Sequence, residues 1–134
     1  MFRVKYSREI VLKLLYQVDI MGLDKQFTPE QLLENNRYFF QVITRLEKKF
    51  ILKIVQKVLD EMDEIDRLLS ENLIGWKLKR MMSIDRTLLR MGVAESYFNT
   101  QKAILIDDVI RIAKKYGGED SYKIINAILD RVIK

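Results

Sequence analysis

Residues 76–98, WKLKRMMSIDRTLLRMGVAESYF, form the stretch that decides the expected fold. Gly92 and Ala94 in it are small, which allows a second helix to approach closely. Ser83 is the expected N-cap, and Asp85 places a negative charge at the positive end of the helix dipole. Apolar residues begin at helical spacing and then spread around most of the helix; they are Ile84, Leu88, Leu89, Met91 and Val93. The stretch therefore predicts a central helix with neighbours on several sides.

Helix signals also occur before this centre. Apolar residues at three- and four-residue spacing predict a first helix over 4–21, which ends at Gly22. The sequences of 28–31 and 44–47 are capping boxes, which mark helix starts. From the second box, a clean apolar stripe predicts one long helix to about Leu73.

After the centre, a turn over 99–101 leads to an expected helix from about 103 to 116, with Gly117 or Gly118 supplying a left-handed residue at its end. A further apolar stripe predicts a last helix up to the C-terminus. A loop is expected over 24–27. No stretch has the alternating pattern of a strand, so the expected fold is all-α with six or seven helices.

The composition limits the classes of function. The chain has 134 residues, 49% of them hydrophobic and only one Pro, which fits one helical domain over 1–134. It has neither Cys nor His, which excludes disulfides, thiolate and imidazole metal sites, and Ser-His-Asp or Cys-His catalysis. No apolar run is long enough to span a membrane, and residues 1–20 do not show the apolar stretch and small-residue cleavage site of a signal peptide. We expect a cytoplasmic protein that is not an enzyme, that binds no cofactor or metal, and that does not associate with a membrane.

The formal net charge of +5 favours an anionic partner, of which nucleic acid is the usual one. Arg3, Lys5 and Arg8 gather at the start of the first helix. Lys5 and Arg8 lie within one turn and could face one phosphate backbone together. A solvated helix end is the alternative, although cations are slightly unfavourable at this end of the dipole.

Two other features have simpler interpretations. The long helix carries five carboxylates in its second half, but it lacks the glycine of a calcium loop, so a solvated face is expected. Trp76 is the only tryptophan, and three cations flank it at Lys77, Lys79 and Arg80. We expect its indole to be a packing wedge between the long helix and the central helix.

Three groups of motifs carry a resemblance to a known family. The first group is Arg8-Glu9 with Leu15-Tyr16-Gln17-x-Asp19. The second is Ile65-Asp66 with Leu73 to Trp76 and Ile84-Asp85-Arg86-x-x-Leu89-Arg90. The third is Ile106-Asp107-Asp108 with Ala113-Lys114-Lys115-Tyr116-Gly117, Ser121 and Ile125-Asn126-Ala127-x-Leu129-Asp130. In this order and spacing the sequence resembles the NusB family of bacterial transcription antitermination factors. Residues 31–47 add little to the resemblance.

The resemblance implies an all-α fold of about seven helices in two small packed bundles. It implies a non-catalytic adaptor that pairs with the ribosomal protein NusE and binds boxA RNA in nascent transcripts, chiefly of ribosomal RNA operons. With other Nus factors, such an adaptor helps the RNA polymerase elongation complex read through terminators. Members of the family occur as monomers or homodimers.

The resemblance also implies roles for individual residues. The RNA surface falls on Arg3, Lys5, Arg8, Asp120, Ser121, Tyr122 and Lys123, and the NusE contacts fall on Tyr16 and Asp85. Asp120 could select a base by accepting a hydrogen bond from its amino group. Tyr6 and Tyr122 could stack on bases or be partly buried. The N-terminal segment has fewer arginines than some members of the family.

Two alternatives stay open at this point. A self-associating helical protein would use one apolar face for a second copy, with RNA incidental. A similar helical domain is also fused to RNA cytosine methyltransferases, so an accessory domain of RNA-modification machinery is the other alternative. This sequence has no Gly-rich cofactor motif, and we expect the methyltransferase itself to be absent.

Overall fold

The structure is a computed structural model that describes residues 2–22 and 27–134. In these residues the chain forms seven α-helices and two short 3-10 helices, and no strand. The helices are α1 Val4–Met21, α2 Pro29–Asn36, η1 Arg37–Phe39, α3 Arg45–Asp60, α4 Met62–Glu71, η2 Leu78–Arg80, α5 Ser83–Ser96, α6 Lys102–Tyr116 and α7 Ser121–Val132. The prediction of an all-α fold with about seven helices is confirmed.

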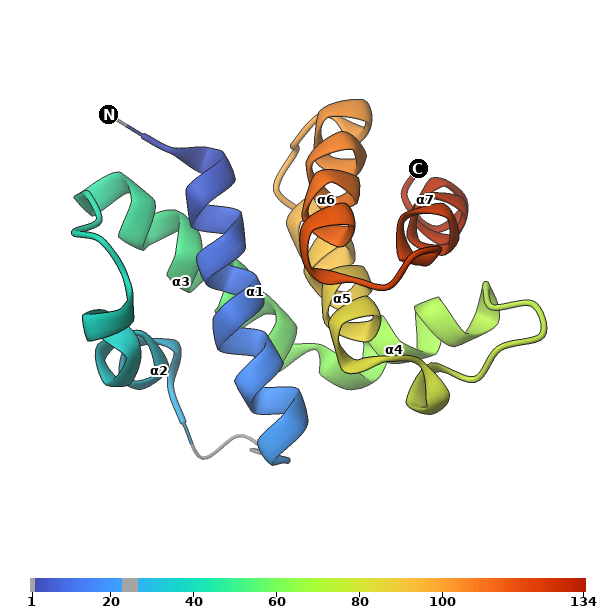
Figure 1. The fold of residues 1–134 in the computed structure, drawn as a ribbon, viewed down its shortest axis with the longest axis horizontal. Helices are drawn as coiled ribbons and strands as arrows, with labels where there is room; N and C mark the ends of the chain where they lie inside the picture. Colours follow the sequence, from blue (N-terminus) through green and yellow to red (C-terminus); the bar gives the residue numbers. More distant parts are fainter. Residues whose placement is uncertain (1, 23–26) are drawn as a thin grey trace.

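Helix α5 is the centre of the fold, as its sequence predicts. It contacts α1, α3, α4, α6 and α7, and most of its residues are buried (Figure 1). Gly92 permits a close approach of α7, because a Cβ at this position would lie 3.1 Å from both terminal carbons of Leu129 on α7. The small residue in the middle of α5 therefore serves helix packing.

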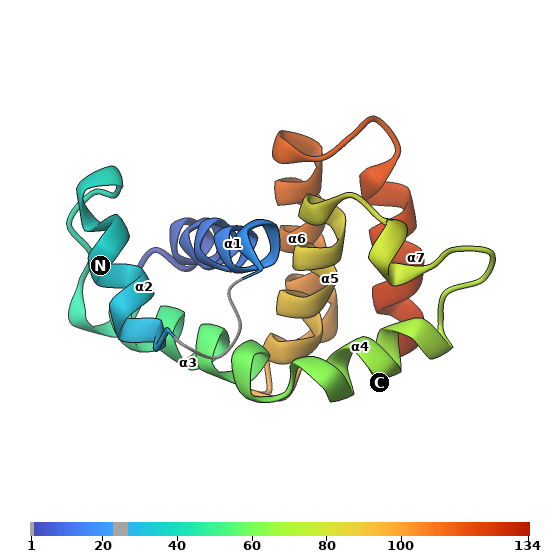
Figure 2. The same cartoon turned by 90° about the horizontal axis from the view of Figure 1, so that it is seen from below.

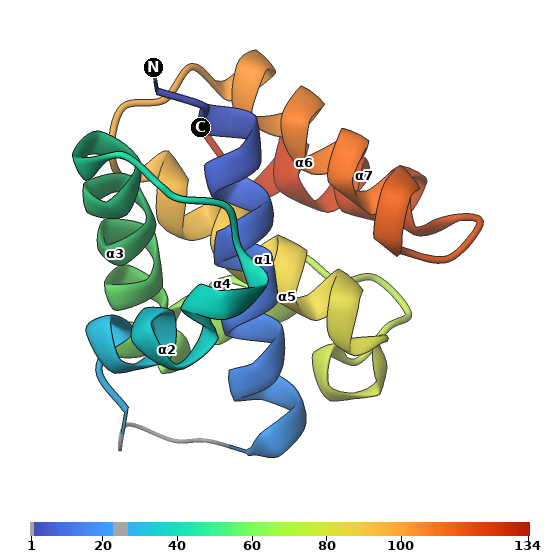
Figure 3. The ribbon, with the colours of Figure 1, turned by 60° about the vertical axis from the view of Figure 1, so that its left-hand side comes forward.

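The helices form two groups. Helices α1, α2 and α3 make one bundle, and α4 to α7 make the other, with α1 lying between α3 and the second bundle (Figures 1 and 3). Figure 2 shows α3 and α4 following one another along one side of both bundles. The contact between α1 and α5 joins the two groups into one body.

Local chemistry sets most helix ends where the sequence predicts them. Both capping boxes are formed, at Thr28 and at Thr44, and Gly22 ends α1 with a left-handed φ of 61°. The prediction of one long helix to about Leu73 is wrong, because the helix is interrupted at Glu61, where φ is −120° and ψ is 27°. The interruption lets α3 pack on α1 while α4 turns toward α5 and α7.

Three smaller predictions are also wrong. Ser83 does not cap α5, because its hydroxyl donates to the carboxylate of Asp19 on α1. Gly117 is extended, with φ −87° and ψ −177°, and no left-handed glycine ends α6. Trp76 is not a packing wedge, since it is 56% exposed. The loop expected over 24–27 lies, for 24–26, outside the described residues.

Candidate nucleic-acid interface

Arg8, expected on an RNA surface, lies inside the protein. It is 3% exposed, and its guanidinium donates to both carboxylate oxygens of Glu95 on α5, at 2.8 and 2.7 Å. A third bond of 2.9 Å reaches Asp108 on α6. The expectation that Lys5 and Arg8 face one phosphate backbone together is therefore wrong, because Arg8 is buried between two carboxylates, one of which Arg111 also binds, and joins α1 to the second bundle.

Arg3 is committed to a carboxylate as well. Its Nε and Nη2 donate to the two oxygens of Glu47 at 2.8 and 2.9 Å, and its backbone amide donates to the same group at 2.7 Å. The Arg3 hydrogen bonds lower the pKa of the buried Glu47 carboxyl well below its ordinary value. Lys5 differs from both arginines, because it is exposed and forms no salt bridge in the described part of the chain.

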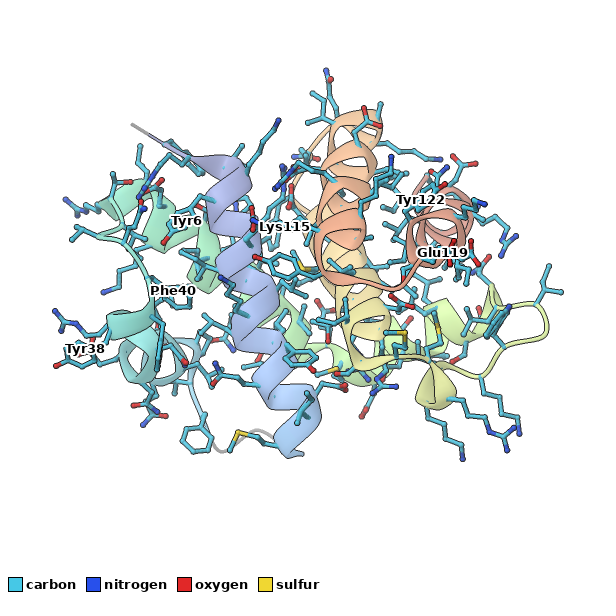
Figure 4. All side chains as sticks on the ribbon, in the orientation of Figure 1. Tyr6, Tyr38, Phe40, Lys115, Glu119 and Tyr122 are labelled. Atoms are coloured by element: carbon cyan, nitrogen blue, oxygen red, sulfur yellow. The ribbon has the colours of Figure 1, made fainter. Side chains whose placement is uncertain are left out.

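The exposed cations near α1 continue over α6 to the start of α7. We call this set the cationic seam: Lys5, Lys13, Arg111, Lys114, Lys115 and Lys123. Arg111 links it to the N-terminus, since its Nη2 donates to the Lys5 carbonyl at 3.4 Å. The Lys114 ammonium lies 4.8 Å from the ring centre of Tyr122, which carries the seam from α6 to α7. Figure 4 labels Lys115 and Tyr122 on this side of the molecule.

Three carboxylates of the described residues pair with cations of the seam. Asp108 binds Arg111 at 2.6 Å, and Asp120 lies 3.6 Å from Lys123. The third is Glu9. It accepts hydrogen bonds from Lys115 at 2.7 Å, from the Tyr116 hydroxyl at 2.9 Å and from Arg111 at 3.1 Å. Burial raises the pKa of the Glu9 carboxyl, but these hydrogen bonds outweigh burial and leave that pKa below its ordinary value. Glu9 is therefore an anion that orders the side chains around it, while the cations outnumber it.

The start of α7 combines a ring, a cation and a carboxylate. Tyr122 is half-buried, with the ammonium of Lys123 at 5.8 Å from its ring centre in addition to that of Lys114. Asp120 is exposed, and one of its oxygens lies 3.6 Å from the Lys123 ammonium. Ser121 is buried, and its hydroxyl accepts a 2.8 Å bond from the Gly118 amide. Ser121 thus shapes the turn between α6 and α7 and does not face solvent.

Four members of the seam were not predicted from the sequence. Lys13, Arg111, Lys114 and Lys115 have no motif of a nucleic-acid site around them, and the lysine pair lies where helix dipoles favour cations anyway. The available signal was the run Lys114-Lys115-Tyr116, which belongs to the third motif group. Only the tertiary contacts between α1 and α6 show that Arg111 lies beside Lys5 and that Lys115 lies beside Glu9.

The two residues expected to contact a protein partner lie elsewhere on the helices. Tyr16 is half-buried on α1. Asp85 is in the first turn of α5, is 6% exposed, and its Oδ1 has no hydrogen-bond partner in the structure as described. An unpaired buried acceptor of this kind costs about 1–3 kcal/mol.

A second ion-pair cluster holds α1 to α4 and α5. Asp19 accepts from Arg86 at 2.6 Å and from Arg90 at 2.8 Å, and Arg90 also binds Asp66 at 2.8 Å. Burial raises the pKa of Asp19, but the bonds from Arg86, Ser83 and Arg90 outweigh burial and lower that pKa to about 2. The cluster is consistent with a structural role, because its charges neutralise one another.

Among the described residues, no group of three or more His, Cys, Asp or Glu side chains is placed to hold a metal ion. None of the described helices is both long and apolar enough to cross a membrane.

Comparison with known proteins agrees with the resemblance. The model of the NusB family matches residues 5–134. The transcription antitermination protein NusB of a Nitratiruptor species is 31% identical over 129 residues, which are 96% of this chain and 89% of that relative. T. maritima NusB superimposes with a TM-score of 0.85 at 29% identity, over 99% of this chain and 92% of that chain. A structure of antitermination factors NusB and NusE in complex with dsRNA has the same fold, with a TM-score of 0.84 at 24% identity, covering 96% of this chain and 94% of that chain.

Proposed function

Because the chain belongs to the NusB family, we propose that it is a transcription antitermination factor: a non-catalytic, cytoplasmic adaptor that binds boxA RNA and the ribosomal protein NusE. Together with other Nus factors it acts on the RNA polymerase elongation complex, chiefly on ribosomal RNA transcripts. Residues 1–134 act as one domain in this role. Support comes from the curated relative, which is named for antitermination, and from the solved structure that contains NusB, NusE and dsRNA.

The cationic seam is the observation that carries the RNA half of the proposal. Its lysines are exposed on three helices that meet at one side of the molecule, and phosphate contacts supply most of the affinity of proteins for nucleic acid. Lys5 and Lys123 keep the role expected from the sequence. Arg3 and Arg8 take a supporting role instead, because their ion pairs hold α1 in place.

The start of α7 is the proposed place of base recognition. The half-buried ring of Tyr122 can stack on a base, and the exposed carboxylate of Asp120 can accept a hydrogen bond from a base amino group. Ser121 contributes by closing the turn that presents both residues.

The NusE half of the proposal uses Tyr16 and Asp85. The unpaired Oδ1 of Asp85 is an acceptor at the margin of the core, which suits a donor from a partner protein. Asp85→Asn is the appropriate test, because a lysine at a position 6% exposed would bury a charge and unfold the protein. We expect Asp85→Asn to weaken NusE binding and to leave binding of RNA alone unchanged.

The experiment that tests the function measures binding of a boxA RNA and a scrambled RNA over a salt series, with and without NusE. We expect preference for boxA RNA, tighter binding with NusE, and a salt slope that decreases in Lys5→Gln/Lys114→Gln/Lys123→Gln by about one unit per lost contact. The matched control removes three exposed lysines of α3, as Lys48→Gln/Lys49→Gln/Lys53→Gln. Equal binding of both RNAs with and without NusE would refute the proposal, and a mass measurement of the free protein would then test self-association.

A further inference from the structure

The one tryptophan of the chain is held outside the fold by an anchored loop. Gly75 adopts a left-handed φ of 77° and turns the chain just before Trp76, whose side chain is 56% exposed. Arg131 of α7 donates to the Asn72 carbonyl at 2.8 Å on one side of the loop. On the other side, Arg86 donates to the Leu78 carbonyl at 3.1 Å. The exposure of Trp76 is thus built into the structure.

Trp76 is continuous with the proposed RNA surface. Its indole lines a hollow of about 290 Å³ together with residues of α7, and one of these is Lys123 of the cationic seam. The loop between α4 and α5 lies beside α7 in Figure 2. On its other side, Trp76 lines a second hollow, of about 440 Å³, with Lys77 and Arg80. A chain that crosses Lys123 therefore meets the indole next, and Lys77 and Arg80 after it.

The charge around Trp76 is positive. Lys77, Lys79 and Arg80 are exposed, and the salt bridges found across residues 2–22 and 27–134 include none of them. Trp76 also lines a third hollow, in which two carboxylates are present, Asp19 and Asp66. Arg86 and Arg90 already bind both of them. An anionic occupant fits this loop.

Single-stranded RNA fits better than an acidic protein segment. Single strands are bound by aromatic side chains that stack on bases and by cations that track the phosphates, and both are present on one short loop. An acidic peptide would use the cations but would leave the indole face without a partner. The continuity with Lys123 favours the same RNA that the seam binds.

We propose that Trp76 is a stacking platform for a base outside the boxA motif, on the single-stranded segment that leaves the cationic seam over Lys123. Lys77, Lys79 and Arg80 contact the phosphates of that segment. This inference rests on the proposed function, because it takes the seam as the start of the RNA path. It extends the footprint of the protein beyond the residues that read boxA.

The test compares a boxA RNA with the same RNA extended by about eight unpaired nucleotides at either end. Because Trp76 is the only tryptophan, intrinsic fluorescence reports directly on its stacking. We expect one of the extended RNAs to bind about tenfold more tightly than the short boxA RNA and to quench the fluorescence. The short RNA should bind without quenching. Trp76→Ala should remove this gain and leave binding of the short RNA unchanged, and Trp76→Phe should retain part of it.

Two control variants and one variant of the loop cations separate stacking from general effects. Ile104→Ala removes an exposed apolar side chain of α6 that lines none of the hollows beside Trp76, and should leave the gain unchanged. Lys77→Gln/Lys79→Gln/Arg80→Gln should lower the salt slope for the extended RNA only. The α3 triple variant of Lys48, Lys49 and Lys53 loses the same charge from the other bundle and should preserve the gain.

The outcomes distinguish this inference from the proposed function. Specific binding of the short RNA, with no gain from either extension and no quenching, overturns the Trp76 platform and leaves the proposed function standing. Quenching and a Trp76-dependent gain without any preference for boxA over scrambled RNA would support the platform and refute the boxA assignment. If Trp76→Ala weakens NusE binding and leaves the binding of every RNA unchanged, the platform is overturned, and Trp76 contacts a protein instead.

Discussion

Arg8 and Glu95 form a two-point ion pair inside the protein, with Nε donating to Oε1 at 2.8 Å and Nη2 to Oε2 at 2.7 Å. The two residues are 3% and 2% exposed, and they connect α1 of the first bundle to α5 of the second. The Nη1 group of Arg8 donates to Asp108 at 2.9 Å, which also connects α6 to α1. The relative position of the two bundles, and hence the alignment of the seam across α1 and α6, depends on this cluster.

Arg8→Ala should lower the free energy of unfolding by about 3–5 kcal/mol, because it leaves the buried Glu95 carboxylate without a cation and Asp108 with Arg111 alone. Lys5→Ala, one turn earlier and exposed, should change the free energy of unfolding by less than about 0.5 kcal/mol. Urea denaturation followed by circular dichroism measures both values. Similar stabilities for the two variants would show that the buried pair contributes nothing.

The pair also marks the limit of what the sequence could predict. Capping boxes, glycine stops and the apolar stripe act within a few residues, and for this reason the helix starts at Pro29 and Arg45 and the burial of α5 were predicted correctly. The partners of Arg8 are 87 and 100 residues away along the chain. A cation near a helix start has the same local pattern whether it faces solvent or pairs inside, so its burial could not be read from spacing.

The candidate site was predictable in part for the same reason. Lys5, Asp120 and Lys123 are exposed where a surface role needs them, whereas Ser121 is buried. The contribution of Lys114 depends on the turn that brings α6 beside Tyr122, and this turn is a tertiary feature. Trp76 was misassigned because a lone aromatic residue is usually buried, and only the left-handed turn at Gly75 places it outside.

Asp19→Asn should destabilise the protein in a pH-dependent way. The folded pKa of Asp19 is about 2 and its ordinary value is 3.8, so the charged carboxylate stabilises the fold fully above the ordinary value. This contribution is lost as the pH falls from about 4 toward 2. The free energy of unfolding of the wild type should exceed that of Asp19→Asn by about 1–2 kcal/mol near pH 6. This difference should shrink below pH 4.

Denaturation at a series of pH values from 6 to about 2.5 measures this difference directly. Asp63→Asn is the control, because Asp63 is an exposed carboxylate that lies outside the ion pairs of the described residues. A difference between wild type and Asp19→Asn that stays constant through this range would contradict the role assigned to the Arg86 and Arg90 bonds.

The turn between α6 and α7 allows a comparison of two adjacent glycines. A Cβ at Gly117 would lie 2.7 Å from the Ala113 carbonyl oxygen and 2.8 Å from the Ser121 side chain, whereas a Cβ at Gly118 meets nothing closer than 3.6 Å. Gly117→Ala should therefore cost about 1–3 kcal/mol by overpacking, and Gly118→Ala should be close to neutral. Thermal unfolding of the two variants tests this, and equal melting temperatures would show that the turn yields without cost.

Asp120→Asn should separate base selectivity from affinity. The exposed Asp120 carboxylate repels phosphates and lies 3.6 Å from the Lys123 ammonium, so its neutralisation should raise the affinity for every RNA by a few-fold. If the carboxylate accepts a hydrogen bond from a base amino group, the amide accepts it less strongly and also offers a donor to the wrong base. The preference for boxA over scrambled RNA should then fall by about fivefold or more, within the roughly 1–3 kcal/mol that such a base contact supplies.

Asp130→Asn is the matched control, because Asp130 is an exposed carboxylate of the same helix and is paired with Lys102 at 3.2 Å. Should both variants raise affinity equally and leave the preference unchanged, Asp120 would act through its charge alone, and base reading would have to come from Tyr122 or from outside α7.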